Sequence, residues 1–133
     1  NENFVTQKII RSAKKIKKDR NLKLTLGNVE IIRDWGWAPE YMEAVQLVTE
    51  SNNIKDYIIC SGTSHPLKIF IEKVFDYYSL NWKNHIVIDQ SLFRPNEIPS
   101  SLGDPKPIHT DLGWRAKEDI DSIIEKLIKL SNN

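Results

Sequence analysis

Short extended segments alternate with longer amphipathic segments along this chain of 133 residues. The first two extended segments alternate polar and apolar side chains or are bounded by turn residues. The other two are continuous apolar runs, and such runs are typical of strands that are buried on both faces. In chain order they are Leu22–Leu26, Glu30–Trp35, Tyr57–Cys60 and Ile86–Ile88. Such alternation with helices indicates an α/β fold, but the strands are too few and too short for a complete doubly wound sheet. We therefore expect part of a larger fold.

The segments between the strands have helical periodicity. Apolar side chains recur every three or four residues, so that each segment presents one apolar face. A helix with Pro39 in its first turn follows the second strand, and Ser64 is positioned to cap the next helix, with Pro66 just inside it. The chain has further helical patterns at residues 4–18, 108–112 and 117–130, and a loop at residues 94–104.

Composition excludes several classes of protein. The formal net charge is +1, and the basic run Arg11–Arg20 has no interleaved aromatic residues, so a solvated helix face is favoured over a nucleic-acid surface. No apolar run is long enough to span a membrane. The single cysteine, Cys60, forms no internal disulfide and fits a cytoplasmic location. The start, Asn1-Glu2-Asn3, lacks an initiator Met and a signal peptide, which indicates a piece of a longer protein.

The chain lacks the residue patterns of a complete catalytic machine. A dinucleotide site needs closely spaced glycines at a helix N-terminus, and no two of the five glycines here are close enough. No tyrosine is followed by a lysine four residues later, so the Tyr-x-x-x-Lys pair of short-chain dehydrogenases is absent. The three histidines and Cys60 do not have zinc-ligand spacing. We predict no catalytic, cofactor-binding or metal-binding residue within this chain.

Five ordered motifs carry a family resemblance. In chain order they are Asn3-Phe-Val-Thr-Gln-Lys-Ile9, Leu26-Gly-Asn28 with Arg33-Asp-Trp-Gly36, Phe93-Arg-Pro-Asn-Glu97, Leu102-Gly-Asp-Pro105 and Leu112-Gly-Trp114. Together they resemble the C-terminal part of the GDP-mannose 4,6-dehydratases, which are extended short-chain dehydrogenases. The chain departs from the family at Gln7, Trp37-Ala-Pro-Glu40 and Lys106-Pro-Ile108, which loosens the substrate assignment but not the domain type.

The resemblance implies a fold and an activity. It implies that residues 1–133 are a single substrate-binding domain, with the Rossmann core largely absent, from an enzyme that converts GDP-mannose to GDP-4-keto-6-deoxymannose. NADP and the catalytic tyrosine and lysine would belong to the missing N-terminal half, so the chain alone would be inactive. The partner would be GDP-mannose or a related nucleotide sugar, and the parent is expected to be a cytoplasmic homo-oligomer.

Seven residues are candidates for binding this substrate. The planar fork of an arginine suits a pyrophosphate, and a carboxylate suits a vicinal diol because both of its oxygens accept. The resemblance assigns these roles to Arg33, Arg94 and Glu97. It also implies that the nucleotide pocket is lined by four further residues, Val5, Lys8, Gly27 and Asn28.

Other interpretations stay open at this level. The parent could be a related epimerase or 4-keto reductase, which the missing half would decide, or the chain could be a non-catalytic nucleotide-binding module. An arginine in a chain with 28% charged residues commonly forms a surface ion pair, and Val5 could be only a core residue. The four tryptophans are more typical of core or interface anchors than of a sugar-stacking platform.

Overall fold

The computed structural model describes residues 4–52 and 55–131. Its first element, α1 (Val5–Lys18), forms because apolar residues recur along one face. Ile9, Ile10 and Ala13 on that face are completely buried. Lysines are concentrated in the last turn, where their positive charge interacts favourably with the negative end of the helix dipole. The helix predicted for residues 4–18 is thus confirmed.

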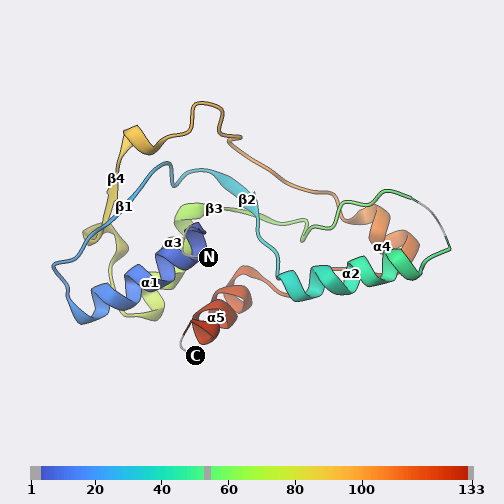
Figure 1. Ribbon diagram of the computed structural model, residues 1–133, viewed down its shortest axis with the longest axis horizontal. Coiled ribbons are helices and arrows are strands. Elements are labelled where there is room, and N and C mark those ends of the chain that lie inside the picture. The colour runs from blue at the N-terminus through green and yellow to red at the C-terminus, as the bar shows by residue number, and fades with distance from the viewer. Residues whose placement is uncertain (1–3, 53–54, 132–133) are drawn as a thin grey trace.

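The larger of two lobes has a parallel pair of strands along one edge (Figure 1). The strand β1 (Leu24–Leu26) pairs with β4 (Ile86–Ile88), with Leu24 opposite Ile86 and Leu26 opposite Ile88. Helices α1, α3 (Leu67–Tyr77) and α5 (Ile120–Leu130) share one core with β1. Its fully buried side chains include Phe70, Phe75, Ile71, Val74 and Ile128.

A second pair of strands lies between the lobes. The strand β2 (Ile32–Asp34) pairs antiparallel with β3 (Ser64–Pro66), and Arg33 is opposite His65. The predicted role of Ser64 as a helix cap is therefore wrong, and Pro66 stands before α3 rather than inside it. The carbonyl of Ile31 accepts from the backbone N–H of Leu67 at 2.9 Å, so pairing with the β2 region holds these residues extended up to the first residue of α3.

The smaller lobe contains α2 (Ala38–Glu50) and α4 (Lys106–Leu112). Its buried core is limited to Ala44, Ile108 and Trp114 among the described residues. Polar contacts supplement this core. Glu40 is buried, and its carboxylate accepts from the backbone N–H groups of Lys117 at 3.0 Å and Glu118 at 3.3 Å. The N-terminus of α2 is thus tied to the segment that leads into α5.

A second carboxylate holds the turn after Cys60. The two oxygens of Asp34 accept from the backbone N–H groups of Ser61 and Gly62, each at 2.9 Å. Gly62 has φ +77°, a conformation that a side chain would strain. Burial, together with the negative charge of the Asp34 carboxylate, raises the pKa of the nearby Tyr41 hydroxyl to about 12.

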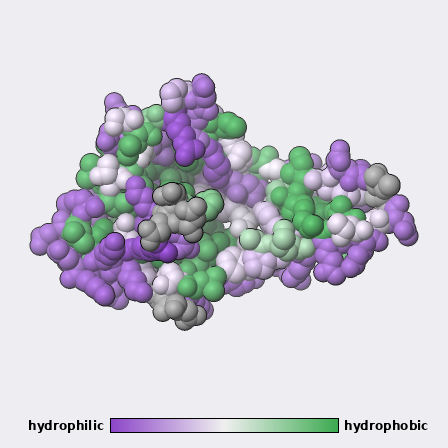
Figure 2. Space-filling view, in the orientation of Figure 1, coloured by the Kyte–Doolittle hydropathy of each residue, from purple (hydrophilic) through white to green (hydrophobic). Residues whose placement is uncertain are grey.

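Two predictions about the strands require correction. Tyr57–Cys60 is extended but pairs with no strand in the described chain, and Ile58 is 64% exposed. Ile86–Ile88 is a strand, yet Val87 and Ile88 are each 45% exposed, so it is not buried on both faces. Apolar side chains predict burial only where something covers them, and no described element covers these faces. Figure 2 shows apolar surface on both lobes.

The remaining boundaries differ modestly from the sequence-based expectation. The helix α4 begins at Lys106 rather than Ile108, and α5 begins at Ile120, where the side chain of Asp119 caps it by accepting from the N–H of Ser122. Two short 3-10 helices, η1 (Trp82–Asn84) and η2 (Gln90–Leu92), were not predicted. The α/β class with short strands and flanking helices is confirmed. No helix in the described ranges is long and apolar enough to cross a membrane.

Candidate functional site

A hollow of about 420 Å³ opens on the larger lobe, beside the end of β1. The turn after β1, the strand β2, the end of η2 and the segment that follows η2 enclose it. Residues far apart in sequence meet here because the carbonyl of Leu26 accepts from the N–H of Asp89 at 2.8 Å, and the N–H of Ile32 donates to the carbonyl of Pro99 at 2.9 Å. These two bonds fix both ends of the loop that carries Arg94 and Glu97.

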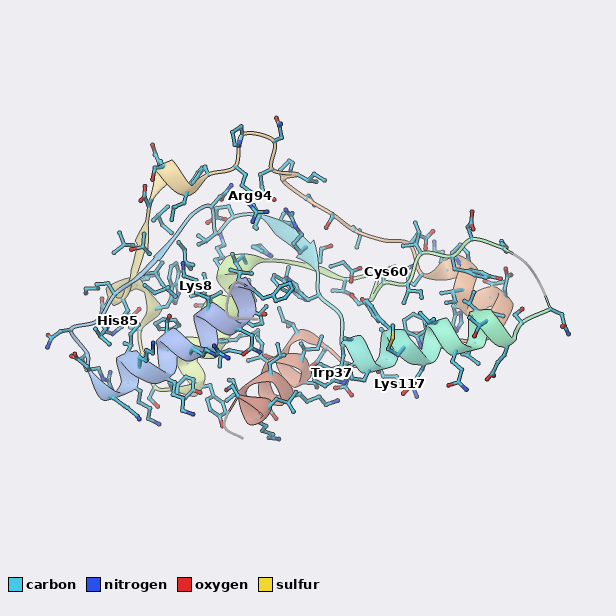
Figure 3. All side chains as sticks on the ribbon, viewed as in Figure 1. Lys8, Trp37, Cys60, His85, Arg94 and Lys117 are labelled. Atoms are coloured by element: carbon cyan, nitrogen blue, oxygen red, sulfur yellow. The ribbon has the colours of Figure 1, made fainter. Side chains whose placement is uncertain are left out.

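The hollow collects most of the residues that the sequence had singled out. Six of the seven candidates line it: Val5, Gly27, Asn28, Arg33, Arg94 and Glu97. The seventh, Lys8, is on α1, and its ammonium donates to the carbonyl of Thr25 at 3.1 Å. Figure 3 shows Lys8 on α1 below the loop that carries Arg94. Lys8 is therefore close to the hollow but is not among the residues that line it.

Arg33 is held in place by the protein itself. Its Nη1 donates to the carbonyls of Ile32 and Ile98, both at 2.8 Å, and its Nη2 donates to the Glu97 carboxylate. Three of its five N–H donors are thus used, which leaves two for a ligand. The side chain is 26% exposed, so its position is largely set before any ligand arrives.

Arg94 differs from Arg33 in exposure. Its side chain is 83% exposed, and its Nε lies 3.9 Å from the second carboxylate oxygen of Glu97. An exposed ion pair at this distance contributes little to stability. Glu97, by contrast, is only 24% exposed and stands between the two guanidinium groups. The three side chains form an Arg33–Glu97–Arg94 cluster at the mouth of the hollow.

The turn after β1 forms one wall. A Cβ on Gly27 would lie 2.9 Å from the carbonyl oxygen of Leu92, so the close approach of the chain itself already requires glycine at this position. The side-chain oxygen of Asn28 accepts from the N–H of Glu30 at 2.9 Å in a local turn, and its amide N–H₂ group remains as a donor. Asn28 is therefore held with its donor side available.

Apolar side chains that carried no predicted role line the rest of the hollow. They are Leu26, Ile31, Trp35, Leu67, Leu92 and Phe93. Trp35 stacks on Phe70 with ring centroids 5.3 Å apart, and its Nε1 donates to the carbonyl of His65 at 3.0 Å. Trp35 is thus anchored against the core, in agreement with the expectation that the tryptophans are core or interface anchors. Phe93 belongs to the motif that contains Arg94, and its position next to Arg94 is the signal that could have identified it as a lining residue.

The arrangement suits a ligand with three different parts. Two guanidinium groups provide charge-assisted donors for an anion, and a carboxylate accepts from hydroxyl groups. The apolar wall offers surface for a flat ring, and the volume falls within the usual range of small-molecule sites. A phosphorylated, hydroxylated compound with an aromatic ring fits this description.

The molecule has other hollows, one of which, of about 520 Å³ and lined by Glu72, Asp76 and residues 79–83, is larger. A hollow of about 210 Å³ lies between the lobes, lined by Trp35, Ser61, Thr63, His65 and residues 116–120, and apart from Trp35 it shares no lining residue with the first. Within residues 4–52 and 55–131, no group of three or more histidine, cysteine or acidic side chains is placed to hold a metal ion.

Comparisons with known proteins agree with the motifs. The sequence model of the family described as GDP-mannose 4,6 dehydratase matches residues 1–127. GDP-mannose 4,6 dehydratase 1 of Arabidopsis thaliana is 39% identical over 127 residues, which cover 96% of this chain and 35% of the relative. The human GDP-mannose 4,6 dehydratase is 29% identical, over 95% of this chain and 38% of its own length. The chain thus spans little more than a third of these curated relatives.

Solved structures show the same fold. The protein RMD of Pseudomonas aeruginosa, solved with NADPH, superposes with a TM-score of 0.84 at 20% identity, over 97% of this chain and 42% of that one. MoeE5, solved with UDP-glucuronic acid and NAD, gives a TM-score of 0.80 at 12% identity, over 99% of this chain and 42% of that one. The family match over residues 1–127, the ordered motifs and this fold lead to one conclusion: the chain belongs to the GDP-mannose 4,6-dehydratase family.

Proposed function

We propose that this chain is the nucleotide-sugar-binding part of a GDP-mannose 4,6-dehydratase, an enzyme that converts GDP-mannose to GDP-4-keto-6-deoxymannose. One observation carries the proposal. Six residues that family motifs suggest as substrate contacts, from four separate stretches of sequence, line a single hollow. Chance proximity would not be expected to select them from 133 positions.

In this proposal each part of the nucleotide has its own contacts. Arg33 supplies a fixed pair of donors for one phosphate, and Arg94 extends from the loop to the other. Glu97 accepts from the ribose diol, Asn28 donates to the nucleoside, and Gly27 and Val5 shape the wall beside it. Lys8 contributes positive charge near the mouth. These contacts are remote from the reacting carbons, so they would place the sugar rather than act on it.

The residues of this chain do not fit a dinucleotide cofactor. A pyrophosphate cradle needs open space above closely spaced glycines, whereas a Cβ on Gly27, Gly36, Gly62 or Gly103 would meet atoms of the chain itself at 2.9 Å or less. NADP would therefore be held by a part of the parent outside this chain, together with the catalytic tyrosine and lysine. We expect the purified chain to form no 4-keto sugar even with added NADP.

A related nucleotide-sugar epimerase or reductase is the second candidate. The similarity in fold to MoeE5, which was solved with UDP-glucuronic acid, motivates it. The two candidates differ in the base that the apolar wall receives, so calorimetric titration of the chain with GDP-mannose, GDP and UDP separates them. We expect both guanine nucleotides to bind and UDP to bind more weakly. Preference for UDP would favour the second candidate, and absence of binding to all three would contradict the site.

A cellular location and an assembly state are part of the proposal. A cytoplasmic location fits the single cysteine, Cys60, which is reduced and buried. A homo-oligomeric parent is proposed from the family alone. Sedimentation of the full-length parent tests that proposal, and a monomer at all concentrations would contradict it.

A further inference from the structure

The Arg33–Glu97–Arg94 cluster has an internal conflict. Glu97 is proposed to hold a ribose diol, yet one of its oxygens is already bonded to Arg33 and the other faces Arg94. Arg33 and Arg94 are proposed to hold phosphates, yet both are partly neutralised by the same carboxylate. In the free protein the Glu97 carboxylate is therefore already engaged by Arg33, and the positive charge that should face the phosphates is partly neutralised.

Charge balance indicates how the conflict is resolved. Two arginines and one glutamate leave one net positive charge within this cluster. The diphosphate of a nucleotide sugar brings two negative charges, which match the two arginines only if Glu97 is directed elsewhere. The hydroxyl groups of the ribose are donors that can take up a carboxylate released in this way.

We propose that Glu97 is an exchangeable counter-ion that determines which anions the site accepts. In the free protein it pairs with Arg33, and it moves to the ribose diol when phosphates take the arginines. The inference rests on the proposed function and extends it to specificity. A ligand that carries phosphates without a diol displaces Glu97 but leaves it without a partner, which is costly for a charged group that is 24% exposed. The site therefore favours ribonucleotides over 2′-deoxyribonucleotides and over inorganic pyrophosphate.

Replacement of Glu97 should consequently have opposite effects on two probes. In Glu97→Gln the pyrophosphate no longer competes with a carboxylate, so its affinity for the chain rises several-fold, and the gain shrinks as salt screens the charges. GDP gains from the same relief, but the loss of the hydrogen bonds from its diol to a charged acceptor outweighs that gain, so its affinity falls, by up to roughly ten-fold. The unmodified chain prefers GDP to 2′-deoxy-GDP by a similar factor, and the variant loses most of this preference.

The experiment is calorimetric titration of the chain, Glu97→Gln and Glu97→Asp with GDP, 2′-deoxy-GDP and pyrophosphate at two salt concentrations. Glu97→Asp keeps the charge, so it should not gain affinity for pyrophosphate. Glu125→Gln, at an exposed ion pair on α5, is the matched control and should change neither probe. Circular dichroism melts verify that each variant is folded.

The outcomes separate the two levels of the argument. Opposite changes for GDP and pyrophosphate support the counter-ion, whereas parallel losses for both, or no change in either, overturn it. If the unmodified chain binds no GDP, the proposed function fails. The pyrophosphate titration still tests the counter-ion in that case, because its predicted gain does not depend on a nucleotide.

Discussion

The two lobes are stabilised in different ways. The larger lobe has a continuous apolar core in which α1, α3 and α5 bury whole helix faces, and Phe70 and Phe75 are fully enclosed. The smaller lobe buries Ala44, Ile108 and Trp114 and is supplemented by backbone contacts of the carboxylates Asp34 and Glu40. Apolar burial in the larger lobe is spread over many side chains and is large in total, whereas the smaller lobe depends on a small core and a few hydrogen bonds. We therefore expect the larger lobe to retain its structure and its site when the smaller one opens.

The largest effect is expected for Phe70→Ala. Phe70 is completely buried and supports Trp35, whose ring lines the hollow, so the change should cost about 3–5 kcal/mol of unfolding free energy and abolish GDP binding. Urea unfolding and calorimetry measure both. Ile108→Ala removes an equally buried side chain from the smaller lobe and serves as the comparison. If it too abolished GDP binding, the lobes would not be independent.

The next effect is expected for Glu40→Gln. The amide oxygen can accept from one of the N–H groups of Lys117 and Glu118 but leaves the other without its partner, at a cost of about 1–3 kcal/mol. Hydrogen exchange should rise in α2 and around residue 117 and stay unchanged in α1 and α3. Glu43→Gln, at an exposed position on the same helix, is the control. Faster exchange throughout the chain would show that the two lobes unfold as one unit.

Arg94→Lys tests whether the site can be weakened without loss of stability. Lysine keeps the charge but loses the planar fork, so GDP affinity should fall by about 1 kcal/mol while the melting temperature stays constant, since the side chain is 83% exposed. Arg20→Lys, at an exposed arginine that does not line the hollow, is the control. A lower melting temperature with unaltered affinity would assign Arg94 a structural role instead.

The smallest effect concerns pH and the smaller lobe alone. Hydrogen bonds from Lys55 and Tyr57 lower the pKa of Asp111 below its ordinary value of 3.8. A lowered folded-state pKa means that the stabilisation is present above the ordinary pKa and is lost as pH falls through the folded value. Protection of the amides near Tyr57 from hydrogen exchange, taken relative to the intrinsic exchange rate at each pH, should therefore decrease below about pH 4. Asp111→Asn should remove this pH dependence, and its persistence in the variant would exclude Asp111 as the cause.

The sequence predicted the larger lobe better than the smaller one. The apolar faces of α1, α3 and α5 are buried in a core that these helices themselves form, so helical periodicity was sufficient to predict them. Tyr57–Cys60 has the composition of a buried strand, but composition does not reveal whether a partner strand lies within the chain. The extended conformation of Ser64 is imposed by the β2 region, which local capping rules cannot anticipate.

The candidate site was anticipated through motifs rather than through physical pattern. Arg94 and Glu97 are separated from Arg33 by about sixty residues, and only the family resemblance connected them. The pairing of Arg33 with Glu97 could not be predicted from the sequence, because no local pattern connects two residues 64 positions apart. The apolar wall at Leu92 and Phe93 was missed because exposed apolar residues after a strand carry no distinctive signal.

The parallel pairing of β1 with β4 has a consequence for how the chain acquires its structure. Leu24 meets Ile86 only after the intervening segment, which contains α2 and α3, has been made, so the ladder joins residues that leave the ribosome far apart in time. Closing a loop of that size costs entropy before the contact is gained, and non-local strand pairing slows folding. During synthesis, the apolar face of α1 stays exposed until α3 emerges, and its covering is complete only when α5 follows, because these helices share its core. The wall between Gly27 and Leu92 would be among the later parts of the larger lobe to form, and its delay would expose the nascent chain to chaperones.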